Sequence, residues 1–308
     1  VPPTNNTDMK TYGWELQIGW RDQIGDFKYG AKLSLSDSQS KILRYGNPTG
    51  SLSKYVEGEL IGNIYGYTTI GIAKTDEEMQ QHLASLPNGG QSALGSQWAA
   101  GDIMYADLNG DGKINNGSYT INDMGDMKKI GNSTPRFMTG INLDAAYKGW
   151  DLQMFWQGVL KRDWWPGDKN MTFWGVTDGE WWSTSFKEHL DYFRTSENPL
   201  GENLNSYYPR PIFNTKNNKS QTRYLQNAAY MRLKNIQVGY TFPKVWINKL
   251  MLQNLRIFVS GENLLTITSL SDTMDPETCG AGYQSTEQAN GTVYPLAKTI
   301  SFGLSVNF

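Results

Sequence analysis

The chain has 308 residues, a formal net charge of −2 and a single cysteine, Cys279. Its hydrophobic content is 38% and its mean hydropathy is −0.54, and no run approaches the roughly 20 apolar residues that a membrane-spanning helix requires. One cysteine excludes a disulfide framework within the chain, and the lack of a basic stripe argues against a nucleic-acid partner. Aromatic residues reach 13%, which suits either the interfacial girdles of a membrane β-barrel or a carbohydrate-binding surface.

Seven segments alternate apolar and polar residues with a period of two, which predicts β-strands. In chain order they lie at about 10–20, 25–37, 135–148, 149–160, 229–242, 252–264 and 294–308. The last segment is among the most regular, with apolar side chains at Ile300, Phe302, Leu304, Val306 and Phe308. Strands of about ten residues with one apolar face are typical of a transmembrane β-barrel. The same pattern also fits an edge strand of a soluble β-sandwich.

Three long stretches between these strands lack the alternation and are rich in glycine and polar residues: 38–134, 161–228 and 265–293. Stretches of this length should not be plain loops in a compact domain. We expect short helices within them, one over Thr75–Leu86 and another over about Glu180–Phe193.

The connectors alternate short, long, short, long, short, long. The short ones are Arg21–Gly25, Lys148–Gly149 and Pro243–Met251, the last with room for one helical turn. In an up-and-down sheet alternate connectors lie on the same side, so all three excursions should emerge together, as in outer-membrane barrels. Seven strands cannot close an even-stranded barrel. Further strands are therefore expected before Val1. The first residues of the chain look like a loop, and no signal peptide is recognisable there.

Five motifs occur together within residues 57–308. They are GDIMYADLNGDG at 101–112, IGNSTPRF at 130–137, YKGWDLQMFWQG at 147–158, YMRLKNIQVGY at 230–240, and SGENL at 260–264 followed by DPE at 275–277. In this combination the chain resembles the C-terminal part of the SusC-like TonB-dependent outer-membrane transporters of Bacteroidota.

The resemblance implies an all-β fold, in which this chain supplies the C-terminal strands of an antiparallel transmembrane barrel of 22 strands with long extracellular loops. The N-terminal barrel strands and the plug domain would be absent from this chain. It also implies a SusD-like surface lipoprotein as a lid, and contact with TonB through the missing N-terminal part. The chain would lie in the cell outer membrane, in contact with membrane lipid. The activity would be TonB-dependent import of an oligosaccharide or a peptide, and not catalysis.

One motif has the spacing of a calcium-binding loop. Gly112 stands at the sixth position, where a sharp turn is required, but Ser118 occupies the twelfth position, where a bidentate carboxylate is usual. A later aspartate must replace it, either Asp123 or Asp126. The expected ligands of a structural Ca²⁺ are Asp107, Asn109, Asp111, the carbonyl of Lys113, and Asp123. The alternative is a polar turn held by its own side-chain-to-backbone hydrogen bonds.

A cluster of tryptophans in the second excursion could stack on sugar rings and line a substrate path: Trp164, Trp165, Trp174, Trp181 and Trp182. The alternative is that they pack the excursion against the barrel rim or the lid. Four other tryptophans lie in predicted strands and suit an interfacial girdle: Trp14, Trp20, Trp150 and Trp156. The two histidines, His82 and His189, have no paired ligand, and no nucleophile or zinc motif is present.

A rival hypothesis from another class is a secreted, calcium-stabilised β-sandwich that binds carbohydrate. Solubility separates the two, because a barrel fragment extracts only with detergent. A glycoside hydrolase would need two carboxylates facing one cleft, and nothing in the sequence pairs two of them.

Overall fold

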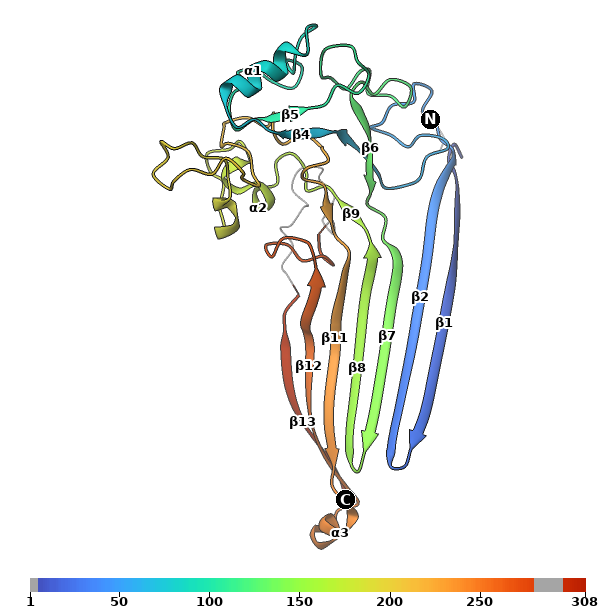
Figure 1. The fold of residues 1–308 in the computed structure, drawn as a ribbon. Coiled ribbons are helices and arrows are strands. Elements are labelled where there is room, and N and C mark those ends of the chain that lie inside the picture. Colours follow the sequence, from blue (N-terminus) through green and yellow to red (C-terminus); the bar gives the residue numbers. More distant parts are fainter. Residues whose placement is uncertain (1–4, 280–295) are drawn as a thin grey trace.

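The structure is a computed structural model that describes residues 5–279 and 296–308. Seven strands form one antiparallel sheet in the order β1-β2-β7-β8-β11-β12-β13 (Figure 1). Their bounds are β1 Asp8–Ile24, β2 Phe27–Arg44, β7 Arg136–Tyr147, β8 Trp150–Lys161, β11 Tyr230–Thr241, β12 Asn254–Thr268 and β13 Thr299–Asn307. The predicted all-β, antiparallel fold is therefore confirmed.

Several strands are longer than the alternation of apolar residues indicates. β2 continues to Arg44 rather than ending near 37, because its polar second half still pairs with β1 along the backbone. The side chains of the paired residues Thr11 and Ser40 also interact, with Oγ1 of Thr11 2.8 Å from Oγ of Ser40. The first excursion therefore begins after residue 44. Residues 280–293 of the third excursion and 294–295 of the last predicted strand lie outside the described residues.

The short connectors lie at one end of the sheet and the long ones at the other (Figure 1). Gly25 and Asp26 close the β1–β2 hairpin, and Lys148 and Gly149, with φ of +45° and +89°, close the β7–β8 hairpin. The β11–β12 connector forms a short helical turn made of α3 (Lys244–Ile247) and η3 (Asn248–Leu250).

The described parts of the long connectors pack together above the sheet into one region, here called the cap. Its elements are β3 Asn63–Tyr67, β4 Thr69–Ile72, α1 Asp76–Ala84, β5 Ile103–Tyr105, β6 Met127–Asn132, β9 Asp163–Trp164, α2 Met171–Trp174, η1 Gly175–Thr177, η2 Lys187–Leu190 and β10 Gln226–Asn227. α1 matches the prediction, and the Thr75 side chain caps it by accepting a hydrogen bond from Glu78 N at 3.2 Å.

The helix expected over Glu180–Phe193 is wrong, since only the one-turn η2 forms there. His189 explains part of the difference. Its Nδ1 accepts a hydrogen bond from Phe186 N at 2.8 Å, and its Nε2 lies 3.1 Å from the carbonyl oxygen of Phe173. The ring thus fixes this segment against α2 in a shape that a continuous helix could not take.

The two faces of the sheet differ in chemistry. The register aligns Ile18 with Leu33, Leu33 with Ile141, and Ile141 with Trp156, so apolar side chains form continuous rows on one face. The opposite face is polar and carries ion pairs between strands, such as Arg21 with Asp144 and Arg256 with Asp151. Among the described residues no second sheet covers the apolar face, where many large side chains are exposed. Within the same residues, no helix has the length and apolar character needed to cross a membrane.

Candidate functional site

Aromatic side chains from the first two long connectors lie in the core of the cap. Trp174 of α2 packs edge-to-face on Tyr224, with ring centroids 4.8 Å apart, and Phe173 packs on Trp174 at the same centroid distance. Tyr105 of β5 is fully buried, and Cys279 from the third connector joins the same cluster. The cap is thus a small packed unit rather than a set of independent loops.

A buried ionic network fastens the first connector to the second. Asp102 accepts hydrogen bonds from Arg210 Nε at 2.8 Å and Asn217 Nδ2 at 2.9 Å, and its Oδ2 lies 2.8 Å from Lys216 Nζ. Burial alone would raise the pKa of Asp102, but the hydrogen bonds from Arg210, Lys216 and Asn217 outweigh it and leave this pKa below its usual value. Lys216 also lies over the ring of Trp98, 4.5 Å from its centroid. Sequence patterns gave no signal for this network.

The structure divides the five predicted substrate-contacting tryptophans into two groups. Trp164 and Trp174 are 3% and 0% exposed, and Trp165 is partly buried against the same core. Protein covers the rings of Trp164 and Trp174, which corrects the expectation that these two line a substrate path. Trp181 and Trp182, by contrast, are 79% and 56% exposed and form an edge-to-face pair with centroids 5.3 Å apart.

Trp181 borders a surface pocket of about 290 Å³. Its other walls come from two segments of the second connector: Val176, Glu180, Ser183, Ser185, Pro211, Ile212 and Phe213. The exposed Phe213 ring was missed in the sequence, where no motif or alternating pattern marks it. The pocket combines apolar walls with Glu180 and two hydroxyls, an arrangement that can stack on a ring and hydrogen-bond to its substituents.

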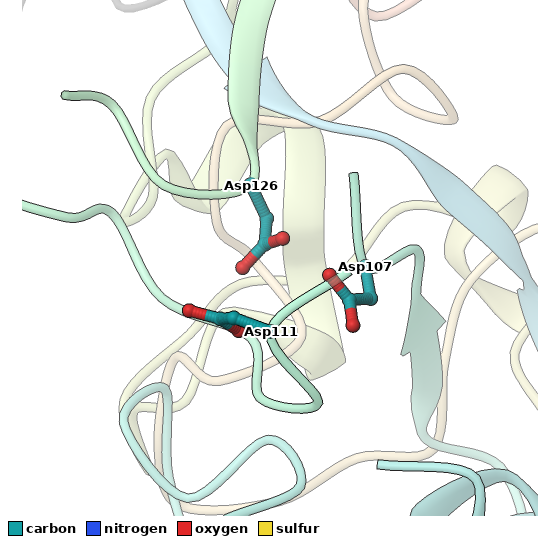
Figure 2. A group of neighbouring side chains, drawn as sticks. All are labelled: Asp107, Asp111 and Asp126. Atoms are coloured by element: carbon teal, nitrogen blue, oxygen red, sulfur yellow. The ribbon is translucent and has the colours of Figure 1, made fainter. Parts of the chain in front are cut away.

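The DLNGDG segment forms a tight acidic loop between β5 and β6. Carboxylates of Asp107, Asp111 and Asp126 converge there, with one oxygen of each lying within 4.8 Å of the others (Figure 2). Asp107 accepts hydrogen bonds from Gly110 N at 2.6 Å and Gly112 N at 2.8 Å. Burial alone would raise the pKa of Asp107, but these two N–H groups outweigh it and lower the pKa.

The structure places Asp126, not Asp123, beside the predicted loop. Asp123 instead accepts hydrogen bonds from the backbone N of Ser118 at 2.9 Å and from its Oγ at 2.6 Å. Asp126 is fully buried and accepts hydrogen bonds from the backbone N atoms of Leu108 and Asn115. Burial raises the pKa of Asp126, and the negative charge of Asp107 adds to the effect.

The residues present fit a hard divalent cation. Three carboxylates meet, and the amide of Asn109 and the carbonyl of Lys113 belong to the same loop. The nearest ion-pairing cation, Lys113 Nζ, lies 3.9 Å from Asp111 and is half exposed. Carboxylate, amide and carbonyl oxygens are the ligands that Ca²⁺ prefers, and a bound cation would offset the repulsion between Asp107 and Asp126. Hydrogen bonds within the loop, such as Asp111 N to Asn109 Oδ1 at 3.0 Å, are also those of the alternative polar turn.

Comparison with known proteins identifies relatives along nearly the whole chain. The chain is 27% identical to TonB-dependent receptor P3 of Formosa agariphila over an alignment of 326 residues, which covers 99% of this chain and 29% of that protein. It is 23% identical to TonB-dependent receptor P39 of the same organism, with coverage of 99% and 31%. No model of a known protein family matches the chain. The chain spans less than a third of the length of these relatives.

Solved structures share the fold. The RagAB peptide transporter superposes with a TM-score of 0.68 at 19% identity, covering 99% of this chain and 30% of that one. The RagAB peptide importer in its closed-closed state gives a TM-score of 0.63 at 17% identity, with coverage of 99% and 30%.

Fold and relatives together define the class of protein to which the chain is similar, the β-barrels of TonB-dependent receptors. The resemblance inferred from the sequence motifs is thereby confirmed, and the structural neighbours are consistent with the C-terminal portion of a SusC-like member.

Proposed function

We propose that the chain forms part of an outer-membrane β-barrel that imports an oligosaccharide or a peptide in a TonB-dependent manner. The observation that carries the proposal is the sheet itself. One face is apolar and uncovered, the other is polar, and the large excursions lie at one end only (Figure 1). A sheet with these properties suits a barrel wall between lipid and a polar lumen.

The height of the apolar face supports this reading. Along β2 the face begins at Phe27 and ends at Asp37, whose carboxylate receives two hydrogen bonds from the Arg136 guanidinium. The ten residue steps between them, at about 3.3 Å each, span about 33 Å along the strand. A tilt of about 40° reduces this to a height of about 25 Å, the thickness of the apolar band in outer-membrane barrels.

Aromatic side chains border the band, as expected at a membrane interface. Phe27, Tyr147, Trp150 and Tyr240 are consecutive partners in the strand register, at the end with the short connectors. Trp14 lies opposite Asp37 at the other end. The band therefore has an aromatic row at the border with the short connectors and Trp14 at the other border.

Substrate would be received by the cap. The exposed pair Trp181 and Trp182, together with Phe213, which lines the same pocket as Trp181, offers aromatic surface for a sugar ring or an apolar peptide side chain. The solved neighbours are described as a peptide transporter and a peptide importer, which supports a peptide as one of the two substrate classes. We further propose that a SusD-like lipoprotein sits over this cap, and that the missing N-terminal part supplies the remaining barrel strands, the plug and the contact with TonB.

A structural Ca²⁺ belongs to the proposal. Asp107, Asn109, Asp111, Asp126 and the carbonyl of Lys113 would hold it, in place of the set that includes Asp123. When bound, the ion would tie the loop after β5 to the start of β6, and no transport step depends on it.

The sandwich alternative receives less support. A β-sandwich needs a second sheet on its apolar face, and the small two-stranded sheets among the described residues all lie in the cap (Figure 1).

Uptake by cells tests the proposal. Cells that express the full polypeptide should accumulate labelled oligosaccharide or peptide, and deletion of TonB or addition of a protonophore should abolish accumulation. Accumulation that persists without TonB would refute energised import. Recovery of the full polypeptide in the soluble fraction without detergent would refute the barrel.

A further inference from the structure

The β11–β12 connector carries an apolar surface that import does not require. It lies at the end of the sheet opposite the cap (Figure 1). Val245, Trp246 and Met251 are 77%, 60% and 87% exposed, whereas Ile247 is buried and anchors the turn. Three large apolar side chains that face water forgo a transfer free energy of about 25 cal/mol for each Å² left uncovered. An apolar environment for this turn is therefore favourable.

Ring contacts connect this turn to the lipid-facing side of the sheet. The rings of Trp150 and Tyr240, which are register partners on the apolar face, have centroids 4.9 Å apart. Phe242 follows at 5.1 Å from Tyr240, and Trp246 at 6.3 Å from Phe242. The four rings form a continuous ladder from the barrel wall to the turn, so Trp246 lies on the outer side.

The position along the strand gives the depth. Tyr240 belongs to the aromatic row at the border of the apolar band, and Phe242 lies two residues beyond it, or about 7 Å along the strand. Trp246 lies beyond Phe242. This is the level of lipid headgroups rather than acyl chains, the level at which tryptophan is enriched in membrane proteins.

The charge of the turn complements an anionic surface. Lys244 and Lys249 are exposed, and residues 242–253 contain neither aspartate nor glutamate. A lysine close to an anionic membrane surface favours association, and its apolar stem can lie along the interface while the ammonium group reaches phosphate.

We propose that residues 244–251 form a binding site for anionic phospholipid headgroups on the short-turn side of the membrane. Val245, Trp246 and Met251 enter the interface, and Lys244 and Lys249 contact the phosphates. This inference rests on the proposed membrane-spanning sheet, and it adds a lipid-specific contact that an aromatic girdle alone does not provide.

Site-directed fluorescence tests the proposal. Cys279, the sole cysteine of the chain, is buried, and its replacement by serine gives a background for single labels. A Val245→Cys variant of the full polypeptide, cleared of other reactive cysteines, carries an environment-sensitive dye in bilayers. Quenchers are phosphatidylglycerol or phosphatidylcholine with a nitroxide on the headgroup, and aqueous iodide. An Ile18→Cys variant, labelled in the middle of the apolar face, is the reference and is probed with acyl-chain nitroxides.

At position 245 the anionic quencher should act more strongly than the zwitterionic one, and iodide should act weakly. Lys244→Gln should reduce the apparent preference for phosphatidylglycerol about fivefold, the equivalent of about 1 kcal/mol per lysine. Lys54→Gln, in the cap, should leave it unchanged. If the label at Ile18 is quenched by lipid, any of three results at position 245 would overturn the site. These are quenching by iodide alone, protection from all quenchers by a protein partner, and an equal response to both lipids. Loss of lipid quenching at Ile18 would instead refute the barrel itself.

Discussion

Lys216 Nζ lies 2.8 Å from Asp102 Oδ2, with both side chains buried, although the two residues belong to different long connectors. Lys216 also donates to the carbonyl oxygens of Ser96 at 3.0 Å and Gln97 at 2.9 Å. The pair therefore holds the first connector against the second and fixes the relative positions of the acidic loop and the aromatic pocket.

Replacing Asp102 with asparagine should loosen the cap. The change leaves Lys216 and Arg210 without their carboxylate in a buried setting, and the expected loss of stability is about 3–5 kcal/mol. Limited proteolysis of the detergent-solubilised protein would report it as faster cleavage within residues 45–135 and 162–229. Asp26→Asn removes a carboxylate from an exposed pair with Lys148 and should change stability by less than about 1 kcal/mol. Equal protease sensitivity of the two variants would contradict the structural role of Asp102.

The same network predicts a pH dependence. The pKa of Asp102 in the folded chain is below its usual value, so the unfolded cap binds this proton more readily than the folded cap. Its contribution to stability is therefore complete above pH about 4 and is lost as the pH falls through the lowered pKa. Proteolysis with an acid-stable protease should accelerate over this range in the wild type. The Asp102→Asn variant lacks the carboxylate, so its stability should not show this pH-dependent contribution. An identical response to acid in the wild type and the variant would exclude Asp102 as the cause.

Calcium binding should depend on Asp126. Isothermal titration of the full polypeptide with Ca²⁺ should show affinity lowered at least about tenfold by Asp126→Asn, because affinity in such loops follows the number of charged ligands. Asp123→Asn is the matched control and should retain affinity, since Asp123 is occupied by Ser118. The opposite ranking of the two variants would restore Asp123 as the ligand. No heat of binding in the wild type would favour the self-bonded polar turn.

Substrate contacts should separate the exposed tryptophans from the buried ones. Trp181→Ala and Trp182→Ala should each weaken binding about two- to tenfold, which corresponds to about 0.5–1.5 kcal/mol for one aromatic contact. Trp174→Ala should instead destabilise the cap by about 3–5 kcal/mol, because it empties part of the core. Trp246→Ala, at the other end of the sheet, should leave substrate affinity unchanged. Full affinity in a Trp181/Trp182 double variant would remove this pocket from the substrate path.

The strands could be predicted because the sheet has one apolar and one polar face, which imposes a two-residue period on each strand. β2 shows the limit of that signal, since Ser38 and Ser40 pair by backbone hydrogen bonds without any apolar alternation. The sequence could not show that Trp164 is buried and Trp181 is exposed, because burial of Trp164 depends on packing against residues far along the chain. Asp123 and Asp126 were the two candidates for the last carboxylate ligand of the loop. The sequence could not decide between them, because the choice depends on the hydrogen bond that Ser118 donates to Asp123.

An accessibility scan along β1 tests the central claim most directly. Spin labels are placed singly at residues 15–20 of the full polypeptide in bilayers, and collision with oxygen, which concentrates in lipid, is compared with collision with a water-soluble nickel complex. Oxygen accessibility should peak at Leu16, Ile18 and Trp20 and fall at Glu15, Gln17 and Gly19. High nickel accessibility at the even positions, or no alternation at all, would show that this face does not meet hydrocarbon and that the chain is not a barrel wall.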